Sequence, residues 1–399
     1  MPVTSQEHGA RLPTVPRTVW VLGLVSLSMD ISSEMIHALM PLFLTVTLGA
    51  SASLIGMIEG IAESSASIVK VFSGYLSDRL GRRKPLLLAG YGLGALSKPL
   101  FALAGAPSVV FIARLADRIG KGIRGAPRDA LVADVTPPSV RGRAYGLRQS
   151  LDTIGAFVGP LMAIGLMVLF ADNARAVFWV AVIPAVVSVL IIVWGVKERP
   201  AGPERARPAP VRLADLRGLD RAFWVVTMVG VVFTLARFSE AFLILKSYHE
   251  GLPLALAPVV LVVMNLVYSL GAYPAGARSD RASPSTLLLW GFVLLVAADL
   301  ALAWASGLTG VLVGVALWGL HMALTQGLFA KLVAQHAPEQ LRGSAFGMFN
   351  LATGVVLMIA SVVAGLLWDS FGPSATFIAG AGFAALAGTL FVAFKPGWR

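Results

Sequence analysis

The stretch FIARLADRIGKGIRGAPRDALVAD, residues Phe111–Asp134, is the most informative about the fold because it places many charged side chains inside a long apolar region. Positions 114, 117, 118 and 121 follow the i, i+3, i+4, i+7 spacing that puts side chains on one face of an α-helix. Positions 124, 125 and 128 continue this face by another turn. Ionisable side chains at membrane depth normally face a bundle interior or a watery cavity. The stretch is therefore predicted to be a membrane-spanning helix with an inward-facing charged side.

The composition excludes a soluble amphipathic helix as the alternative. Of the 399 residues, 57% are hydrophobic and 13% are charged, whereas soluble globular proteins have about 25% charged residues. The net charge is +11, but Arg and Lys fall mainly in short segments between apolar runs, so nucleic-acid binding is not expected. The absence of cysteine excludes disulfides, thiolate metal sites and thiol catalysis. The chain is predicted to be an all-α polytopic membrane protein.

Twelve apolar runs have about the 20 residues that a helix needs to cross a bilayer. The predicted spans are 18–46, 53–76, 85–105, 108–134, 142–170 and 175–196, followed by 221–247, 253–277, 284–305, 308–335, 342–368 and 374–394. The segment 197–220 is basic and rich in proline. We therefore predict two six-helix bundles, 18–196 and 221–394, joined by the linker 197–220, with short tails at 1–17 and 395–399.

The distribution of basic residues predicts the orientation of the chain. Basic side chains gather between the second and third spans, between the fourth and fifth spans, and in the linker. The loops on the other side, such as 49–53 and 104–108, are small and nearly uncharged. Because cytoplasmic loops carry the excess of Lys and Arg, both termini and the linker are predicted to be cytoplasmic.

An internal repeat supports the division into halves. RGRAYG at 141–146 returns as RGSAFG at 342–347, and GYLSDR at 74–79 returns as GARSDR at 276–281. Trp20 and Trp224 open the first span of each half. The three landmarks keep their order at an offset of about 200 residues, which indicates one six-helix unit used twice.

Twelve spans, a central basic linker and Gly-x-x-x-Asp-Arg after the second and eighth spans resemble the major facilitator superfamily of transporters over residues 18–394. The first copy, GYLSDRLGRR at 74–83, matches the loop signature of that family. The resemblance implies that this loop stabilises the cytoplasmic side in one of two states. The gating residues that it implies are Gly74, Asp78, Arg79, Gly81, Arg82 and Arg83.

The fifth and fourth spans place the chain within the superfamily. GAFVGP at 155–160 resembles the exporter motif, whose small residues permit close helix packing and a kink, although Ala163 stands where a glycine is usual. Gly155, Gly159 and Pro160 are therefore assigned to gating, with simple close packing as the alternative. The fourth span has RIGKG at 118–122 where Arg-x-x-Gln-Gly is common. The resemblance indicates an efflux-like bacterial subgroup and leaves the cargo open.

The resemblance also implies that spans one, four, seven and ten line the cavity, whereas spans three, six, nine and twelve face lipid. One helical face of span one carries Asp30, Ser33, Glu34 and His37. Asp30, Arg118 and Lys121 lie about 12 residues into their spans, near the midplane where transporters bind substrate. A carboxylate that changes partner between two states can change its proton occupancy. The proton-coupling candidates are Asp30, Glu34 and Glu63, with static ion pairing between spans one and four as the alternative.

The charges of span four suggest a substrate class. Its cations outnumber its carboxylates, and the planar guanidinium of arginine suits carboxylate or phosphate groups. The substrate-binding candidates are Arg114, Asp117, Arg118, Lys121, Arg124, His37, Arg237 and Glu240. Further gating residues are expected at Arg128, Asp129 and Asp152.

We therefore predict a secondary active transporter that works by alternating access and exports a small amphipathic or anionic organic compound in exchange for protons. It is expected to act as a monomer in the bacterial inner membrane. A carrier of metal ions or metal chelates, with Asp30, Glu34 and His37 as ligands, is the alternative within transport. A non-transporting receptor on the same fold is the alternative outside it. Neither a catalytic constellation nor a Walker pattern is present, so no enzyme activity and no cofactor are expected.

Overall fold

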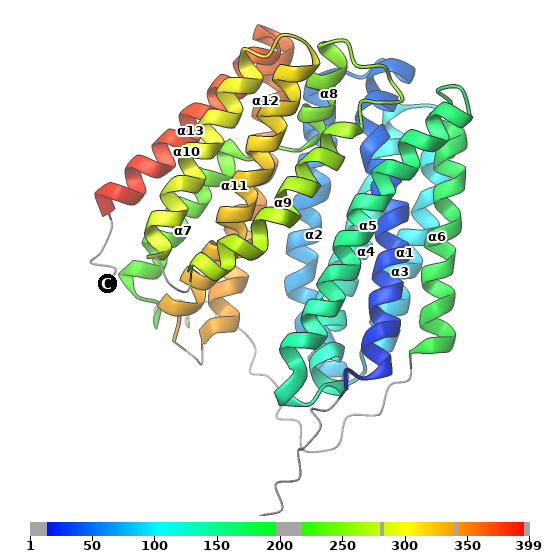
Figure 1. Cartoon of the computed structure of the whole chain (residues 1–399). Helices are drawn as coiled ribbons and strands as arrows, with labels where there is room; N and C mark the ends of the chain where they lie inside the picture. Colours follow the sequence, from blue (N-terminus) through cyan, green and yellow to red (C-terminus); the bar gives the residue numbers. More distant parts are fainter. Residues whose placement is uncertain (1–13, 197–217, 280–282, 339–340, 395–399) are drawn as a thin grey trace, which may run out of the picture.

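The computed structural model describes residues 14–196, 218–279, 283–338 and 341–394. Figure 1 shows two helical bundles side by side. The N-terminal bundle contains α1 (Arg17–Leu42), a π-helical turn (Phe43–Thr47), α2 (Ala52–Leu80), α3 (Lys84–Leu103), α4 (Pro107–Val135), a 3-10 turn (Pro138–Val140), α5 (Arg141–Leu169) and α6 (Ala174–Gly195). The C-terminal bundle contains α7 (Arg221–Ala236), α8 (Ala241–His249), α9 (Val259–Ser279), α10 (Pro284–Ala303), α11 (Gly307–His336), α12 (Arg342–Phe371) and α13 (Pro373–Phe394).

The helix bounds lie close to the predicted spans, with two exceptions: α9 begins at Val259 instead of residue 253, and the seventh span is interrupted. The predicted span 221–247 is wrong as a single helix, because α7 ends at Ala236 and α8 begins at Ala241. No proline or glycine causes this break. Instead, the hydroxyl of Ser239 accepts from the N–H of Ala241 at 3.2 Å, and such side-chain bonds compete with the helical pattern. The break exposes backbone at membrane depth, which discontinuous helices of transporters use to form binding sites.

The charged helix α4 is enclosed by the other helices of its bundle. It packs between α2 and α3. A Cβ atom added at Gly120 would lie 2.6 Å from the carbonyl oxygen of Gly90 on α3, and one at Gly122 would lie 2.7 Å from that of Ala66 on α2. Glycines thus let two neighbouring helices approach the backbone of α4 closely. This enclosure provides the partners that its charged side chains need.

The two bundles meet closely at one end. At this end, which we call the far end, the carboxylate of Asp369 near the end of α12 accepts from the N–H groups of Ala52 and Ser53 at 3.0 and 2.8 Å. Asp369 thus caps the N-terminus of α2 across the boundary between bundles. A Cβ atom at Gly56 would lie 2.1 Å from the carbonyl oxygen of Ser361, so α2 and α12 are in direct backbone contact. The far end is therefore closed.

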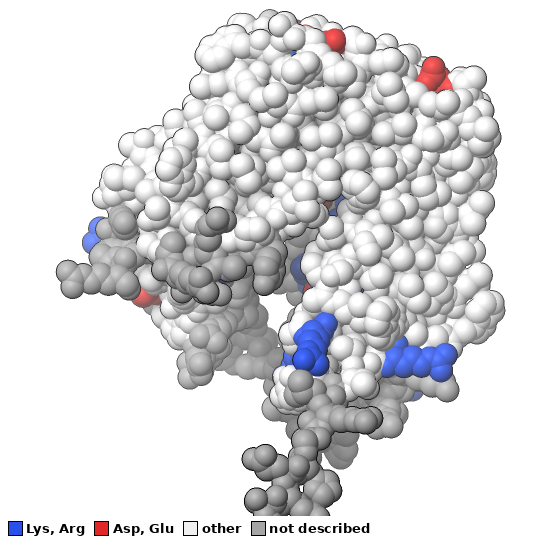
Figure 2. All heavy atoms as spheres, in the orientation of Figure 1, with Lys and Arg blue, Asp and Glu red and all other residues white. Residues whose placement is uncertain are grey.

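The opposite end is open. We call it the linker end, because α6 ends and α7 begins there. Figure 2 shows a hollow between the two bundles at this end, with basic side chains visible inside it. An arrangement that is closed at one end and open at the other is one of the two states that alternating access requires.

Candidate functional site

Two adjoining cavities of about 280 and 430 Å³ lie between the bundles. Both are lined by Glu34 and Glu63, by Lys121 of α4, and by Asn265 of α9. Most of the charged lining comes from the N-terminal bundle. The C-terminal bundle adds Tyr268 and Gln326 among its uncharged groups, and Arg237 and Glu240 at the break between α7 and α8. This pair of cavities, called the central cavity below, is the candidate substrate site.

The exporter-like glycines of α5 position the carboxylates of α1. A Cβ atom at Gly155 would lie 2.9 Å from the Cβ of Asp30, and one at Gly159 would lie 2.6 Å from the Cβ of Glu34. Larger residues at these two positions would displace α1 from α5. The motif assigned to gating therefore lies directly behind the two carboxylates assigned to proton coupling.

Some charged residues of the central cavity are paired and others are not. Glu34 contacts Nδ1 of His37 at 3.3 Å, and Glu63 contacts Arg118 at 3.1 Å. In the described part of the chain, the side chains of Asp30 and Lys121 form no hydrogen bond or ion pair, and the same holds for Arg237 and Glu240. These unpaired groups are available to a proton or a ligand.

Two of the five cations of α4 are matched by carboxylates on α2. Arg114 donates to Glu59 Oε2 at 2.8 Å and to Glu63 Oε1 at 3.3 Å, and Glu63 is shared with Arg118. Arg114 does not line the central cavity as the described residues define it. Part of the cation excess of span four is therefore neutralised by α2 in the folded bundle, which weakens the case for a purely anionic substrate.

A buried lysine that the sequence analysis missed lies on α3. Lys98 is 1% exposed, and its ammonium group donates to Asp117 at 2.7 Å and to Ser33 at 2.9 Å. This contact ties α1, α3 and α4 together and places Asp117 away from the central cavity. A single lysine inside the apolar span 85–105 was the available signal. The expectation that span three only faces lipid concealed it.

Charged residues of α4 and α5 line the cavity toward the linker end. Arg148 donates to Asp152 at 2.8 Å and lies 3.6 Å from Asp129. Arg128 lies 3.6 Å from Asp152 and donates to Ser26 on α1 at 2.8 Å. Three helices of the N-terminal bundle are thus joined beside the opening. Arg124 has a different role, because its guanidinium stacks 4.6 Å above the ring centre of Tyr91.

The loop signature makes its described contacts within the N-terminal bundle. Arg83 contacts Asp78 at 2.5 Å and Asp134 of α4 at 3.4 Å. Gly81 ends α2 with φ +62°, a left-handed conformation that favours glycine. Arg79 and Arg82 are exposed. The second copy of the signature includes Asp280 and Arg281, which lie outside the described residues.

The break between α7 and α8 connects the two bundles. The N–H of Ser239 donates to Ser361 Oγ at 3.2 Å, and its hydroxyl donates to Glu59 Oε2 at 3.4 Å. Glu59 also accepts a hydrogen bond from Arg114 and lies 3.8 Å from His37 Nε2. A movement of the break would thus change the contacts of Glu59 and so alter the ion pairs between α2 and α4.

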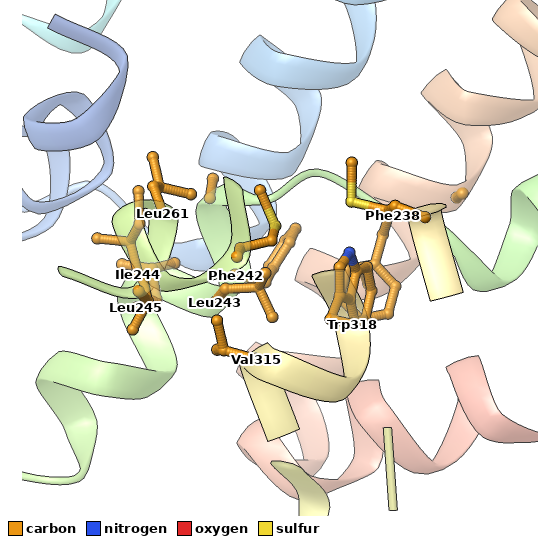
Figure 3. Close-up of a cluster of buried hydrophobic side chains, with 14 of the residues drawn as sticks. Phe238, Phe242, Leu243, Ile244, Leu245, Leu261, Val315 and Trp318 are labelled. Carbon is orange, nitrogen blue, oxygen red and sulfur yellow. The ribbon is translucent and has the colours of Figure 1, made fainter. Parts of the chain in front are cut away.

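An aromatic wall covers the C-terminal side of the cavity. Phe238 and Trp318 both line it, and their ring centres lie 5.5 Å apart. Figure 3 shows these two rings against each other, with Phe242 and Leu243 beside them. The cavity therefore has a charged wall and an apolar wall.

A family model covers nearly the whole chain. The model of the Major Facilitator Superfamily matches residues 22–357, and again 252–397. The chain belongs to this superfamily. It is 28% identical over 393 residues to an uncharacterized MFS-type transporter of Methanocaldococcus jannaschii, covering 97% of each chain. It is 25% identical over 327 residues to the multidrug resistance protein MdtH of Yersinia enterocolitica, covering 81% of this chain and 80% of that protein.

Solved structures of superfamily transporters share the fold. The nucleoside transporter NupG superposes with a TM-score of 0.79 at 14% identity, covering 94% of this chain and 99% of that one. A POT family transporter superposes with a TM-score of 0.81 at 13% identity, covering 96% of both chains. The resemblance predicted from the loop signature and the repeat is thereby confirmed, and the chain is a multi-pass membrane transporter.

Proposed function

We propose that this superfamily member exports a small amphipathic or anionic organic compound in exchange for protons. The observation that carries the proposal is the central cavity, whose lining includes Asp30 and Lys121, neither of which forms a hydrogen bond or an ion pair among the described residues. A carboxyl that lines a cavity can exchange its proton with water or give way to a ligand. The apolar wall of Phe238 and Trp318 suits the uncharged part of an amphipathic compound.

The proton-linked group is proposed to be Asp30, assisted by Glu34 and Glu63. When the protein changes state, α1 must move relative to the elements across the cavity, and the charges near Asp30 change with it. Lys121, Arg118 and Arg124 are the proposed contacts for an acidic substrate group, and Arg237 and Glu240 contribute from the C-terminal bundle. His37 bridges Glu34 and Glu59 and is proposed to hold them in place.

The direction of transport is proposed from two observations. The glycines that resemble the exporter motif lie against Asp30 and Glu34. In addition, relatives of the chain include the multidrug resistance protein MdtH. The linker end is proposed to face the cytoplasm, because its loops are rich in Arg and Lys. The protein is proposed to act as a monomer in the bacterial inner membrane, with both termini in the cytoplasm.

A metal-ion or metal-chelate carrier is less well supported. Within the described residues, no group of three or more His, Asp and Glu side chains could hold a metal ion. His37 is already in contact with the carboxylates of Glu34 and Glu59, and Asp30 is not part of that group.

The test is proton movement in proteoliposomes that hold the full chain and a pH-sensitive dye. Panels of organic anions, organic cations, zwitterions and divalent metals are added in turn. The proposal predicts a pH change for organic compounds and none for metals alone. Stabilisation of the protein by an organic compound without any proton movement would contradict proton coupling. A response to metals alone would support the metal carrier.

A further inference from the structure

Asp299 on α10 is a buried carboxyl that the central cavity does not use. It is 0% exposed, and neither of its oxygens has a hydrogen-bond partner among the described residues. It lies in a span that the sequence resemblance assigned to lipid. Burying an ionised carboxylate without a partner costs many kcal/mol, whereas the neutral acid is tolerated far better. This position therefore favours the protonated form.

The surroundings of Asp299 explain how a carboxyl fits into this helix contact. A Cβ atom at Gly380 on α13 would lie 2.6 Å from Asp299 Oδ2 and 3.1 Å from Cε1 of Phe238. Glycine at this position thus makes room for the carboxyl. The two distances also show that the carboxyl and the ring of Phe238 are neighbours. Phe238 also lines the central cavity, so its ring is close to both the cavity and Asp299.

Few charged groups are available to Asp299. On α11, which packs against α10, the titratable residues are His321, Lys331 and His336. His321 is fully buried, and both of its ring nitrogens lack partners within the described residues. α13 contributes no titratable residue, and α9 contributes Tyr268 among the described side chains. The break between α7 and α8 contributes Arg237 and Glu240, which line the central cavity.

We propose that Asp299 is a proton-binding site of the C-terminal bundle, separated from the central cavity by Phe238 and opened when the break between α7 and α8 moves. The residue stays neutral in the state described here. When residues 237–240 shift with the bundles, the ring of Phe238 moves with them and water reaches the carboxyl, which then releases its proton. This site goes beyond the proposed coupling at Asp30 and gives each bundle one proton-binding carboxyl.

The test is infrared spectroscopy of the full-length protein in lipid nanodiscs, which detects the carbonyl stretch of a neutral carboxyl without any substrate. The proposal predicts such a band at neutral pH and its loss in Asp299→Asn, whose amide has nearly the shape of the neutral acid. Asp172→Asn is the control, because Asp172 is exposed in a turn with φ +62°, which asparagine accepts. An unchanged spectrum in Asp299→Asn would overturn the proposal.

The role of Phe238 is tested with the same band. Phe238→Ala should make the Asp299 band disappear on raising the pH into the alkaline range, because water then reaches the carboxyl. Phe391→Ala, which makes the same truncation on α13, should leave the Asp299 band unchanged. If the two variants behave alike, Phe238 does not shield Asp299.

Chemical labelling gives an independent readout. The wild-type chain is treated with an apolar carbodiimide, which reacts with neutral carboxyls, and the modified peptides are identified by mass spectrometry. If Asp299 is not modified while the protein moves between its two states, this would also count against the proposal.

These measurements separate the inference from the proposed function. The Asp299 band does not depend on any substrate, so it can be present even if no transported compound is found. Conversely, proton exchange through Asp30 alone would leave substrate-driven proton movement intact in Asp299→Asn and would confine the coupling to the N-terminal bundle.

Discussion

Replacing Arg114 by leucine should strongly destabilise the N-terminal bundle. Its guanidinium is 1% exposed and donates to Glu59 at 2.8 Å, and Glu59 is equally buried. Removing the cation leaves a buried carboxylate whose remaining partners are the hydroxyl of Ser239 at 3.4 Å and His37 at 3.8 Å. Breaking a buried pair from one side costs about 3–5 kcal/mol. We expect a loss of this size in the free energy of unfolding.

A double-mutant cycle separates the pair from its packing. Arg114→Leu with Glu59→Leu removes both charges, and replacing a buried pair by apolar residues is often neutral or stabilising. Most of the loss should therefore be recovered in the double variant, as measured by reversible unfolding in mixed micelles. Arg79→Leu is the control, since Arg79 is exposed and should change stability by less than about 0.5 kcal/mol. A loss below about 1 kcal/mol for Arg114→Leu would show that the Arg114–Glu59 pair is not buried as described, because such values are typical of solvated pairs.

Three further predictions concern other parts of the fold. Gly159→Ala places a Cβ 2.6 Å from that of Glu34, so overpacking between α5 and α1 should lower the free energy of unfolding by about 1–3 kcal/mol. Equal stability to wild type in thermal unfolding would contradict this. Hydrogen bonds, first of all from Lys246 at 2.6 Å, lower the pKa of Glu250. The contribution of Glu250 to the free energy of unfolding is therefore complete above its ordinary pKa and is lost as the pH falls through the lowered value. Glu250→Gln should weaken the pH dependence of the free energy of unfolding between neutral and acidic pH, and an unchanged pH dependence would count against the contact. Asp369→Ala removes the cap on α2 and should increase the population of molecules with an open far end by about fivefold, or about 1 kcal/mol. Single cysteines introduced at the far end of this cysteine-free chain should then become more reactive. Unchanged cysteine reactivity would argue against a role of Asp369 in closure.

Much of the fold followed from patterns that are local in sequence. Apolar runs of spanning length predicted the helix bounds, and the charged face of Phe111–Asp134 correctly indicated an enclosed helix. The break at residues 237–240 could not be predicted in the same way, because it has no proline or glycine. It depends on hydrogen bonds of Ser239 to residues that are distant in the chain, Glu59 and Ser361. Such bonds become visible only once the bundles are assembled.

The candidate site was predicted as a set of residues but not as a set of pairs. Asp30, Glu34, Glu63 and Lys121 do line one cavity. The sequence could not show that Arg114 and Asp117 are turned away from it, since this depends on the rotation of α4 between α2 and α3. Lys98 and Asp299 were overlooked because a family-wide rule assigned their spans to lipid. Isolated ionisable residues in apolar spans deserve more weight than such a rule.

Whether Asp30 exchanges a proton during transport is measured by substrate-driven proton movement in proteoliposomes. Wild type, Asp30→Asn and the exposed-loop variant Asp172→Asn are compared, each first shown to bind the substrate. We expect Asp30→Asn to bind the compound without moving protons and Asp172→Asn to behave as wild type. Unchanged proton movement in Asp30→Asn, with the same pH dependence, would exclude Asp30 as the proton-exchanging group.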